Sequence, residues 1–200
     1  GWTFPAEWER HSGTWFSWPR PEGISFPDKY HTIPANLAAI VGAIAPRELV
    51  HINVPNSNYE RIVSEQLVAH GVKQRDLGKR VRFHHIPTNE AWCRDHGPAF
   101  LTKQQRGKTL LSIVDWGFNA WGGKYPPWDA DDAVPTRIAE LMAQGDASIE
   151  GVCEGLWLPR VDDAPVVMEG GSVEFDGRGT VLTSEACLLH KNRNPHLTKR

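Results

Sequence analysis

Residues 48–54 read Glu-Leu-Val-His-Ile-Asn-Val and are followed at once by Pro55. The stretch is short, rich in branched apolar side chains and closed by proline, as expected of a buried strand. A similar run at residues 81–86, Val-Arg-Phe-His-His-Ile, predicts a second strand. Between them, residues 58–71 repeat apolar side chains every three or four positions and end at Gly71, which predicts a helix. This strand–helix–strand order is typical of an α/β fold.

The same alternation continues outward from these residues. On the N-terminal side, the pattern predicts a strand at residues 14–18 and a helix at 31–45. On the C-terminal side, it predicts a helix that opens at residues 131–136 and strands at residues 99–102, 109–115, 166–168, 173–175 and 180–183. Strands joined by tight turns indicate mixed pairing. We therefore predict a mixed α/β (α+β) class, with residues 1–200 in one domain and no linker.

The composition argues against several classes of protein. The 200 residues are 40% hydrophobic and 23% charged, and a net charge of −2 leaves no basic excess for binding nucleic acid. The sequence has neither an apolar run long enough to predict a membrane span nor a visible signal peptide. Three widely spaced cysteines, Cys93, Cys153 and Cys187, argue against a disulfide framework and favour a reducing, cytoplasmic location.

The sequence predicts neither a cofactor nor a metal site. No pair of cysteines or histidines has the spacing of a structural zinc site. His84 and His85 are adjacent, and neighbours on a strand point to opposite faces, so these two side chains do not easily share one ion. A metal-dependent hydrolase acting on a C–N bond is a rival class, and it requires His and Asp side chains that converge on one ion.

Residues 89–98, Asn-Glu-Ala-Trp-Cys-Arg-Asp-His-Gly-Pro, gather charged groups, a histidine, a cysteine and a tryptophan between two predicted strands. If the chain is extended here, Cys93 and Asp95 share one face and His96 lies on the other. That arrangement argues against a catalytic Cys–His pair, and cysteine is more often a small packed residue. The alternative interpretation is a surface loop with an isolated salt bridge.

Two further segments carry candidate chemistry. Residues 115–129 contain three tryptophans, Phe118 and Tyr125 beside paired glycines. They form either a loop packed on its own aromatic rings or a loop that lines a ligand. Residues 165–173, Pro-Val-Val-Met-Glu-Gly-Gly-Ser-Val, place the carboxylate of Glu169 at the end of an apolar run. A buried carboxylate needs a partner, which is either a ligand or an internal Arg or Lys.

Six stretches in the same order, together with the opening residues 4–19, resemble the agmatine deiminase family, which is grouped with the Porphyromonas-type peptidyl-arginine deiminases. The stretches are residues 92–98, 115–124, 128–132, 168–172, 176–180 and 192–196. The resemblance implies the pentein fold, an α/β propeller of five ββαβ units around a central active site, here incomplete. It also implies that the catalytic His and Cys lie beyond residue 200, so we expect these residues alone to be inactive.

The resemblance further implies a guanidine hydrolase that releases ammonia through a covalent cysteine intermediate. The expected reaction converts agmatine to N-carbamoylputrescine in putrescine and polyamine biosynthesis. Peptidyl-arginine is the alternative substrate, because residues 20–27 depart from the agmatine-type pattern. A non-enzymatic, Trp-lined binding module is the remaining alternative. The expected partner is a small guanidino compound or an arginine-containing peptide, with no nucleic acid, membrane or cofactor, and homo-oligomerisation is left open.

By position, the resemblance assigns Asp95 and Glu169 as the catalytic carboxylates that bind the guanidinium. It places the other substrate-binding candidates at Trp92, Gly170, Glu7 (or Glu9), Asn119 and Trp121. The chemistry agrees, because a guanidinium is planar, permanently charged and rich in paired N–H donors. Two carboxylates can therefore fix its plane and leave one face open to a thiolate, with a histidine moving the proton. Trp92 would supply an aromatic face for the cation or its alkyl stem.

Overall fold

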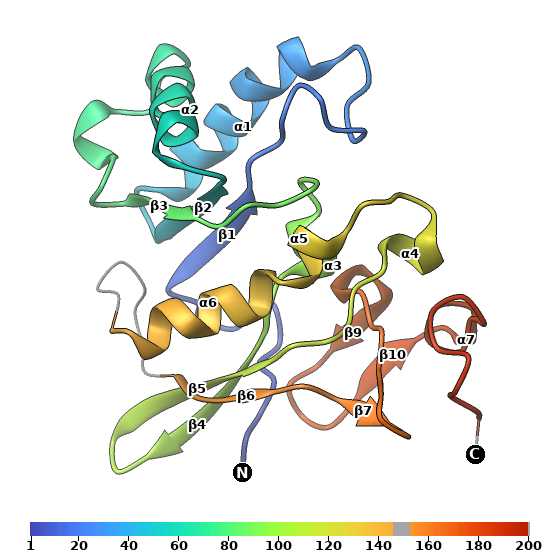
Figure 1. Ribbon diagram of the computed structural model, residues 1–200. Coiled ribbons are helices and arrows are strands. Elements are labelled where there is room, and N and C mark those ends of the chain that lie inside the picture. Colours follow the sequence, from blue (N-terminus) through green and yellow to red (C-terminus); the bar gives the residue numbers. More distant parts are fainter. Residues whose placement is uncertain (146–152, 200) are drawn as a thin grey trace. The chain divides into compact units, whose positions relative to one another are not determined.

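The computed structural model describes residues 1–145 and 153–199, which divide into two compact units (Figure 1). One unit contains residues 10–93, and the other joins residues 1–9 to the chain from residue 94 onward. Both combine helices with strands, so the predicted mixed α/β class is confirmed. The sequence indicated no boundary at these positions, and one catalytic domain for residues 1–200 stays a prediction. Within the described residues, no helix combines the length and apolar character needed to cross a bilayer.

The unit of residues 10–93 is built on a three-stranded parallel sheet with the strand order β1-β2-β3. Its main elements are β1 (Gly13–Ser17), α1 (Ile33–Ile44), β2 (Leu49–Val54), α2 (Ser57–Ala69) and β3 (Val81–His85). Two short 3-10 turns lie at Tyr30–Thr32 and Gln74–Asp76. The predicted alternation of strands and helices is therefore confirmed here, with β2 as the central strand.

Local chemistry explains where the helices of this unit begin and end. Pro34 lies in the first turn of α1, where its missing N–H would have had no helical partner. The Asn56 side chain accepts a hydrogen bond from the Tyr59 N–H at 3.0 Å and caps α2, which begins at Ser57. Gly71 follows α2 with a φ of +98°, a conformation that favours glycine. The predicted stop at Gly71 is thus confirmed.

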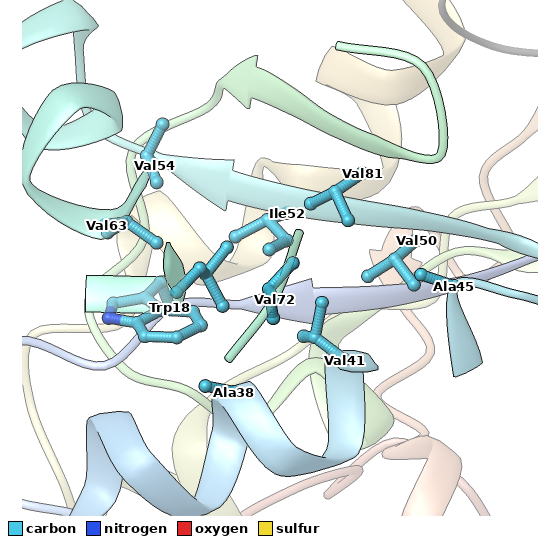
Figure 2. Packing of buried hydrophobic residues seen from close by; sticks show 11 residues of the cluster. Trp18, Ala38, Val41, Ala45, Val50, Ile52, Val54, Val63, Val72 and Val81 are labelled. Atoms are coloured by element: carbon cyan, nitrogen blue, oxygen red, sulfur yellow. The ribbon is translucent and has the colours of Figure 1, made fainter. Parts of the chain in front are cut away.

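The core of this unit lies between the sheet and the two helices (Figure 2). Figure 2 shows Val50 and Ile52 of β2 and Val81 of β3 close to Ala38 and Val41 of α1. All six residues of β2 are buried, and its apolar side chains Val50, Ile52 and Val54 alternate along the strand and belong to this core. The cluster consists of Trp18, Ala38, Val41, Ala45, Val50, Ile52, Val54, Val63, Leu67, Val72 and Val81.

We expect Ile52→Ala to lower the free energy of unfolding by about 2–5 kcal/mol, because it removes a fully buried side chain and leaves a cavity. The measurement is urea unfolding followed by tryptophan fluorescence. Ile40→Ala is the matched control: Ile40 lies on α1 but is 46% exposed, so its removal should cost about 1 kcal/mol or less. Equal losses for the two variants would contradict this core.

The described residues of the second unit form three small sheets. β4 (Ala99–Gln105) and β5 (Lys108–Val114) form an antiparallel hairpin, and β6 (Cys153–Trp157) pairs in parallel with β5. The two-stranded sheets are β7 (Arg160–Val161) with β8 (Ala164–Pro165), and β9 (Val173–Phe175) with β10 (Val181–Thr183). The helical elements are α3 (Cys93–His96), α4 (Ala120–Gly123), α5 (Asp129–Asp132), α6 (Val134–Ala143), α7 (Glu185–Leu188) and a 3-10 turn at Gly170–Ser172. α6 contacts β5 and β6.

Three expectations for this part of the chain were wrong or incomplete. Residues 166–168 are not a strand, since Val167 forms only an isolated bridge to Gly117. The strands β6, β7 and β8 and the short helices α4 and α7 were not predicted. Residues 93–96 form a helical turn and not an extended stretch. The expected sorting of Cys93 and Asp95 onto one face therefore fails, because helical residues follow one another at about 100° around the axis.

Candidate active site

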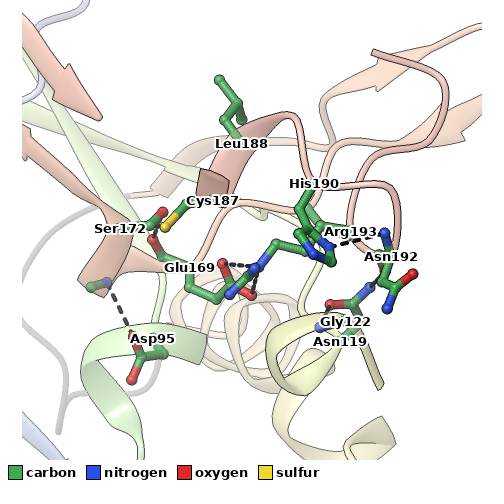
Figure 3. A network of polar contacts seen from close by, with 12 residues as sticks. Asp95, Asn119, Gly122, Glu169, Ser172, Cys187, Leu188, His190, Asn192 and Arg193 are labelled. Atoms are coloured by element: carbon green, nitrogen blue, oxygen red, sulfur yellow. Dashed lines mark hydrogen bonds and ion pairs between the residues drawn. The ribbon is translucent and has the colours of Figure 1, made fainter. Parts of the chain in front are cut away.

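The short helix α3 brings Asp95 against the Glu-Gly-Gly segment. The Gly171 N–H donates a hydrogen bond to Oδ1 of Asp95 at 3.2 Å (Figure 3). The neighbouring Arg94 donates from Nε to the carbonyl oxygen of Gly170 at 3.1 Å. Both contacts join residues 76 positions apart in the sequence. The structure therefore places Asp95 beside the segment that carries Glu169.

The two glycines are required by this close approach. A Cβ added at Gly170 would lie 2.2 Å from the carbonyl oxygen of Arg94, and one at Gly171 would lie 2.3 Å from Oδ1 of Asp95. No side chain fits at either position without a shift of α3. Gly170 was predicted to bind substrate; the structure gives it a steric role, and its contact with substrate stays a prediction.

Asp95 is a partly buried carboxylate whose pKa is raised. Burial raises the pKa of Asp95, the hydrogen bond from Gly171 opposes this, and the negative charge of Glu169 raises the pKa further. Arg94 lowers the same pKa through its charge. Among the described residues, no Lys or Arg forms an ion pair with the Asp95 carboxylate. Asp95 is thus held by the backbone and remains able to accept hydrogen bonds from a cation.

Glu169 is buried and is paired with an arginine of the same chain. Its side chain is only 2% exposed. Its two carboxylate oxygens accept hydrogen bonds from Nε of Arg193 at 2.8 and 3.0 Å (Figure 3). The internal arginine partner that the sequence left open as an alternative is therefore present. The role of Glu169 toward a substrate stays a prediction.

Asn119 and Trp121 lie in the Gly- and Trp-rich loop and make internal contacts. Oδ1 of Asn119 accepts from the Gly122 N–H at 2.9 Å. The Trp121 ring meets Phe118 and Tyr125 edge-on, with ring centroids 6.0 and 5.7 Å apart. The aromatic rings of this loop therefore pack on one another, as the first of the two interpretations expected. Substrate contacts from Asn119 and Trp121 stay predictions.

The two remaining candidates have different surroundings. Glu7 is exposed and forms an ion pair with Arg94, whose guanidinium also lies 3.4 Å from a carboxylate oxygen of Glu174. Glu7 thus has an internal cationic partner, and its contact with a substrate amine stays a prediction. Trp92 is partly buried, follows β3 in the sequence and belongs to the unit of residues 10–93. Its place beside the substrate also stays a prediction.

A buried contact that the sequence analysis missed anchors α3. Nε2 of His96 lies 3.7 Å from Oδ1 of Asp131 in α5, and both side chains are almost fully shielded from solvent. The Phe118 ring meets the His96 imidazole edge-on at a centroid distance of 5.8 Å. These contacts fix the residue that directly follows Asp95. The only signal in the sequence was that Asp131 falls in one of the stretches that resemble the family.

The histidines and cysteines do not gather into one centre. Among the described residues, no group of three or more His, Cys, Asp or Glu side chains is placed to hold a metal ion. Nδ1 of His51 lies 2.9 Å from Nε2 of His84, whereas His85 pairs with Glu60 at 2.7 Å. The adjacent histidines thus have separate partners. Cys93, Cys153 and Cys187 are partly buried and form no disulfide.

Comparison with known proteins identifies the family of this chain. Residues 3–200 match the family described as Porphyromonas-type peptidyl-arginine deiminase, and the chain belongs to this family. It is 38% identical to an agmatine deiminase of Ectopseudomonas mendocina and 37% identical to one of Pseudomonas aeruginosa. Both alignments cover 100% of this chain and 48% of the relative. The chain therefore spans about half the length of the curated relatives it matches.

Solved structures show the same relationship. An X-ray structure of a protein assigned as an agmatine deiminase matches with a TM-score of 0.73 and 36% identity, over 100% of this chain and 48% of that one. A C. jejuni agmatine deiminase with substrate bound matches with a TM-score of 0.71 and 26% identity, over 100% of this chain and 50% of that one. The mixed α/β fold is thus shared with these deiminases, and the five-unit propeller stays a prediction.

Proposed function

We propose that this chain is part of a guanidine hydrolase that converts agmatine and water to N-carbamoylputrescine and ammonia. Membership of the family and the similarity to agmatine deiminases support this reaction class. The observation that carries the proposal is the hydrogen bond from the Gly171 N–H to Asp95. It supports a joint role for Asp95 and Glu169, because it brings the first carboxylate to the segment that holds the second.

In this proposal, Asp95 and Glu169 bind the substrate guanidinium. A carboxylate has about four lone-pair positions, so Glu169 can accept further N–H donors while it is paired with Arg193. Each hydrogen bond to a charged group contributes roughly 1.5–3 kcal/mol. Together the two carboxylates would fix the guanidinium plane and leave its central carbon open to attack from one face.

The reaction itself needs a thiolate and a proton carrier. The thiolate adds to the guanidine carbon, the nitrogen that leaves takes up a proton, and ammonia departs. Water then attacks the same carbon, which breaks the C–S bond and releases the ureido product and the thiolate. We place the nucleophile and the histidine outside residues 1–200, and not at Cys93, Cys153 or Cys187. A cytoplasmic role in polyamine biosynthesis is part of the same proposal.

The test compares substrates on the full-length protein that contains this chain. Ammonia release and ureido product are measured with agmatine and with an arginine-containing peptide. We expect turnover of agmatine and little of the peptide, and no product from residues 1–200 alone. Turnover of the peptide alone would favour the peptidyl-arginine alternative, to which the family description also points. No turnover of any guanidine would contradict the proposal.

The raised pKa of Asp95 predicts a pH dependence. Binding of a cation requires ionised Asp95, and burial shifts the pKa of this group upward. We therefore expect kcat/KM for agmatine to fall about tenfold per pH unit below that raised pKa, and to be independent of Asp95 ionisation above it. A pH profile of initial rates measures this. A profile that stays flat down to about pH 4, the usual range of an aspartate, would contradict the assignment.

A further inference from the structure

Arg193 approaches Glu169 from a segment that is fixed on its C-terminal side. The following residue, Asn194, is only 1% exposed. Its Oδ1 accepts from the Val167 N–H at 2.7 Å, and its Nδ2 donates to the carbonyl oxygens of Val167 and Leu188 at 2.7 and 2.8 Å. These bonds attach the residue after Arg193 to the residue two positions before Glu169.

The segment is also held on its N-terminal side. Nδ2 of Asn119 donates to the carbonyl oxygen of Asn192 at 3.0 Å. Gly122 has a φ of +81°, and a Cβ at this position would lie 2.7 Å from Cβ of Asn192. The turn that contains Gly122 thus lies directly against the residue before Arg193 (Figure 3). Because both neighbours are fixed, the backbone directs the Arg193 side chain toward Glu169, and that side chain is only 11% exposed.

The charges of Asp95, Glu169 and Arg193 favour the binding of one further cation. Two carboxylates close together disfavour the state in which both are ionised, and the charge of Glu169 acts on Asp95 in this sense. Arg193 supplies one permanent positive charge to the more buried of the two. Asp95, Glu169 and Arg193 together then carry one net negative charge. One guanidinium of charge +1 neutralises it.

We propose that Arg193 is a positioning residue, the resident counter-ion that pairs with Glu169 and orients its carboxylate so that the site accepts one substrate guanidinium. The inference rests on the proposed function for the identity of the substrate. The contact between Arg193 and Glu169 does not depend on it. Arg193 therefore acts through Glu169 and is not expected to touch the reacting atoms.

Chemical rescue of Arg193→Ala in the full-length protein tests this role. We expect the substitution to lower kcat/KM for agmatine by about 100-fold or more, because it leaves a buried carboxylate without its cation. Added ethylguanidinium at millimolar concentration should restore at least about tenfold of this loss, while it only competes with agmatine in the unsubstituted protein. Urea, which has a similar shape but no charge, should not restore activity. Arg137→Ala removes one exposed positive charge and serves as the control.

A second readout does not require turnover. Ethylguanidinium should raise the thermal unfolding midpoint of Arg193→Ala more than that of the unsubstituted protein, because it fills the vacated position. The extra shift should vanish in Arg193→Ala combined with Glu169→Gln, where no buried negative charge remains to be neutralised. If Arg193→Ala does not fold, Arg193→Lys keeps the charge and should fold normally with kcat/KM reduced by about tenfold.

The outcomes separate the two proposals. Full activity of Arg193→Ala, with no extra shift by ethylguanidinium, would overturn the role of Arg193 and leave the deiminase reaction in place. Unreduced kcat/KM in Arg193→Lys would overturn the orienting part of this role, because the Nε–H geometry would then be dispensable and a positive charge alone would suffice. Absence of turnover in the unsubstituted protein, together with the charge-dependent stabilisation of Arg193→Ala, would overturn the deiminase reaction and support the counter-ion.

Discussion

We expect Asp95→Asn to lower kcat/KM for agmatine by about a hundredfold or more in the full-length protein. The substitution removes the one carboxylate of the pair that has no internal Arg or Lys ion-pair partner among the described residues. Loss of two charge-assisted hydrogen bonds costs about 3 kcal/mol or more, and 1.4 kcal/mol corresponds to a tenfold change. The amide keeps the shape of the side chain, and its oxygen can still accept from the Gly171 N–H, so the fold should persist.

Asp162→Asn provides the matched control for this variant. Asp162 is exposed in the turn between β7 and β8 and has a φ of +49°, which asparagine also tolerates. Steady-state kinetics and circular dichroism of both variants make the comparison. If Asp95→Asn turned over agmatine as fast as Asp162→Asn, Asp95 would have no part in binding the guanidinium.

Gly171→Ala should damage the site through packing alone. Its Cβ would lie 2.3 Å from Oδ1 of Asp95, so either α3 or the Glu-Gly-Gly segment has to move. We expect the free energy of unfolding to fall by about 1–3 kcal/mol, as for other overpacked sites. Because the same shift displaces Asp95, we expect kcat/KM for agmatine to fall by about a hundredfold, measured on protein shown to be folded by circular dichroism.

A glycine elsewhere in the chain shows what the same added methyl group does without the clash. Gly42 lies in α1, and a Cβ there would meet its nearest atom, on Val72, at 3.9 Å. Gly42→Ala should therefore stabilise the protein by about 0.5–1 kcal/mol and leave activity unchanged. Similar behaviour of Gly171→Ala and Gly42→Ala would show that α3 does not need the close approach at Gly171.

Hydrophobic periodicity predicted the unit of residues 10–93 well, because its central strand is fully buried and its helices carry regular apolar faces. The run at residues 48–54 is rich in branched apolar side chains, and the structure makes residues 49–54 of it the central strand β2. Periodicity was less informative where elements are short. β6 contains a glutamate and a glycine within five residues, and its pairing with β5 is long-range. Residues 166–168 look like a strand because they are apolar, but Asn194 takes up the backbone hydrogen bonds of Val167.

The sequence singled out two acids as candidates for the site, but not the residues that support them. The resemblance singled out Asp95 and Glu169, and the structure brings the two segments together through Gly171. Neither composition nor spacing indicated that Arg193 would pair with Glu169, because the contact depends on how the chain folds back after α7. The extended pattern assumed for residues 93–96 failed for a related reason. His96 is held by Asp131 from a distant part of the sequence, and such a contact leaves no local signal.

The most direct measurement is a crystal structure of the full-length protein with agmatine trapped at low temperature. We predict that the guanidinium nitrogens lie about 2.7–3.2 Å from the oxygens of Asp95 and of Glu169, with Arg193 still bound to Glu169. A guanidinium bound away from Asp95, or an Arg193 side chain that occupies the place of the substrate against both acids, would contradict the account.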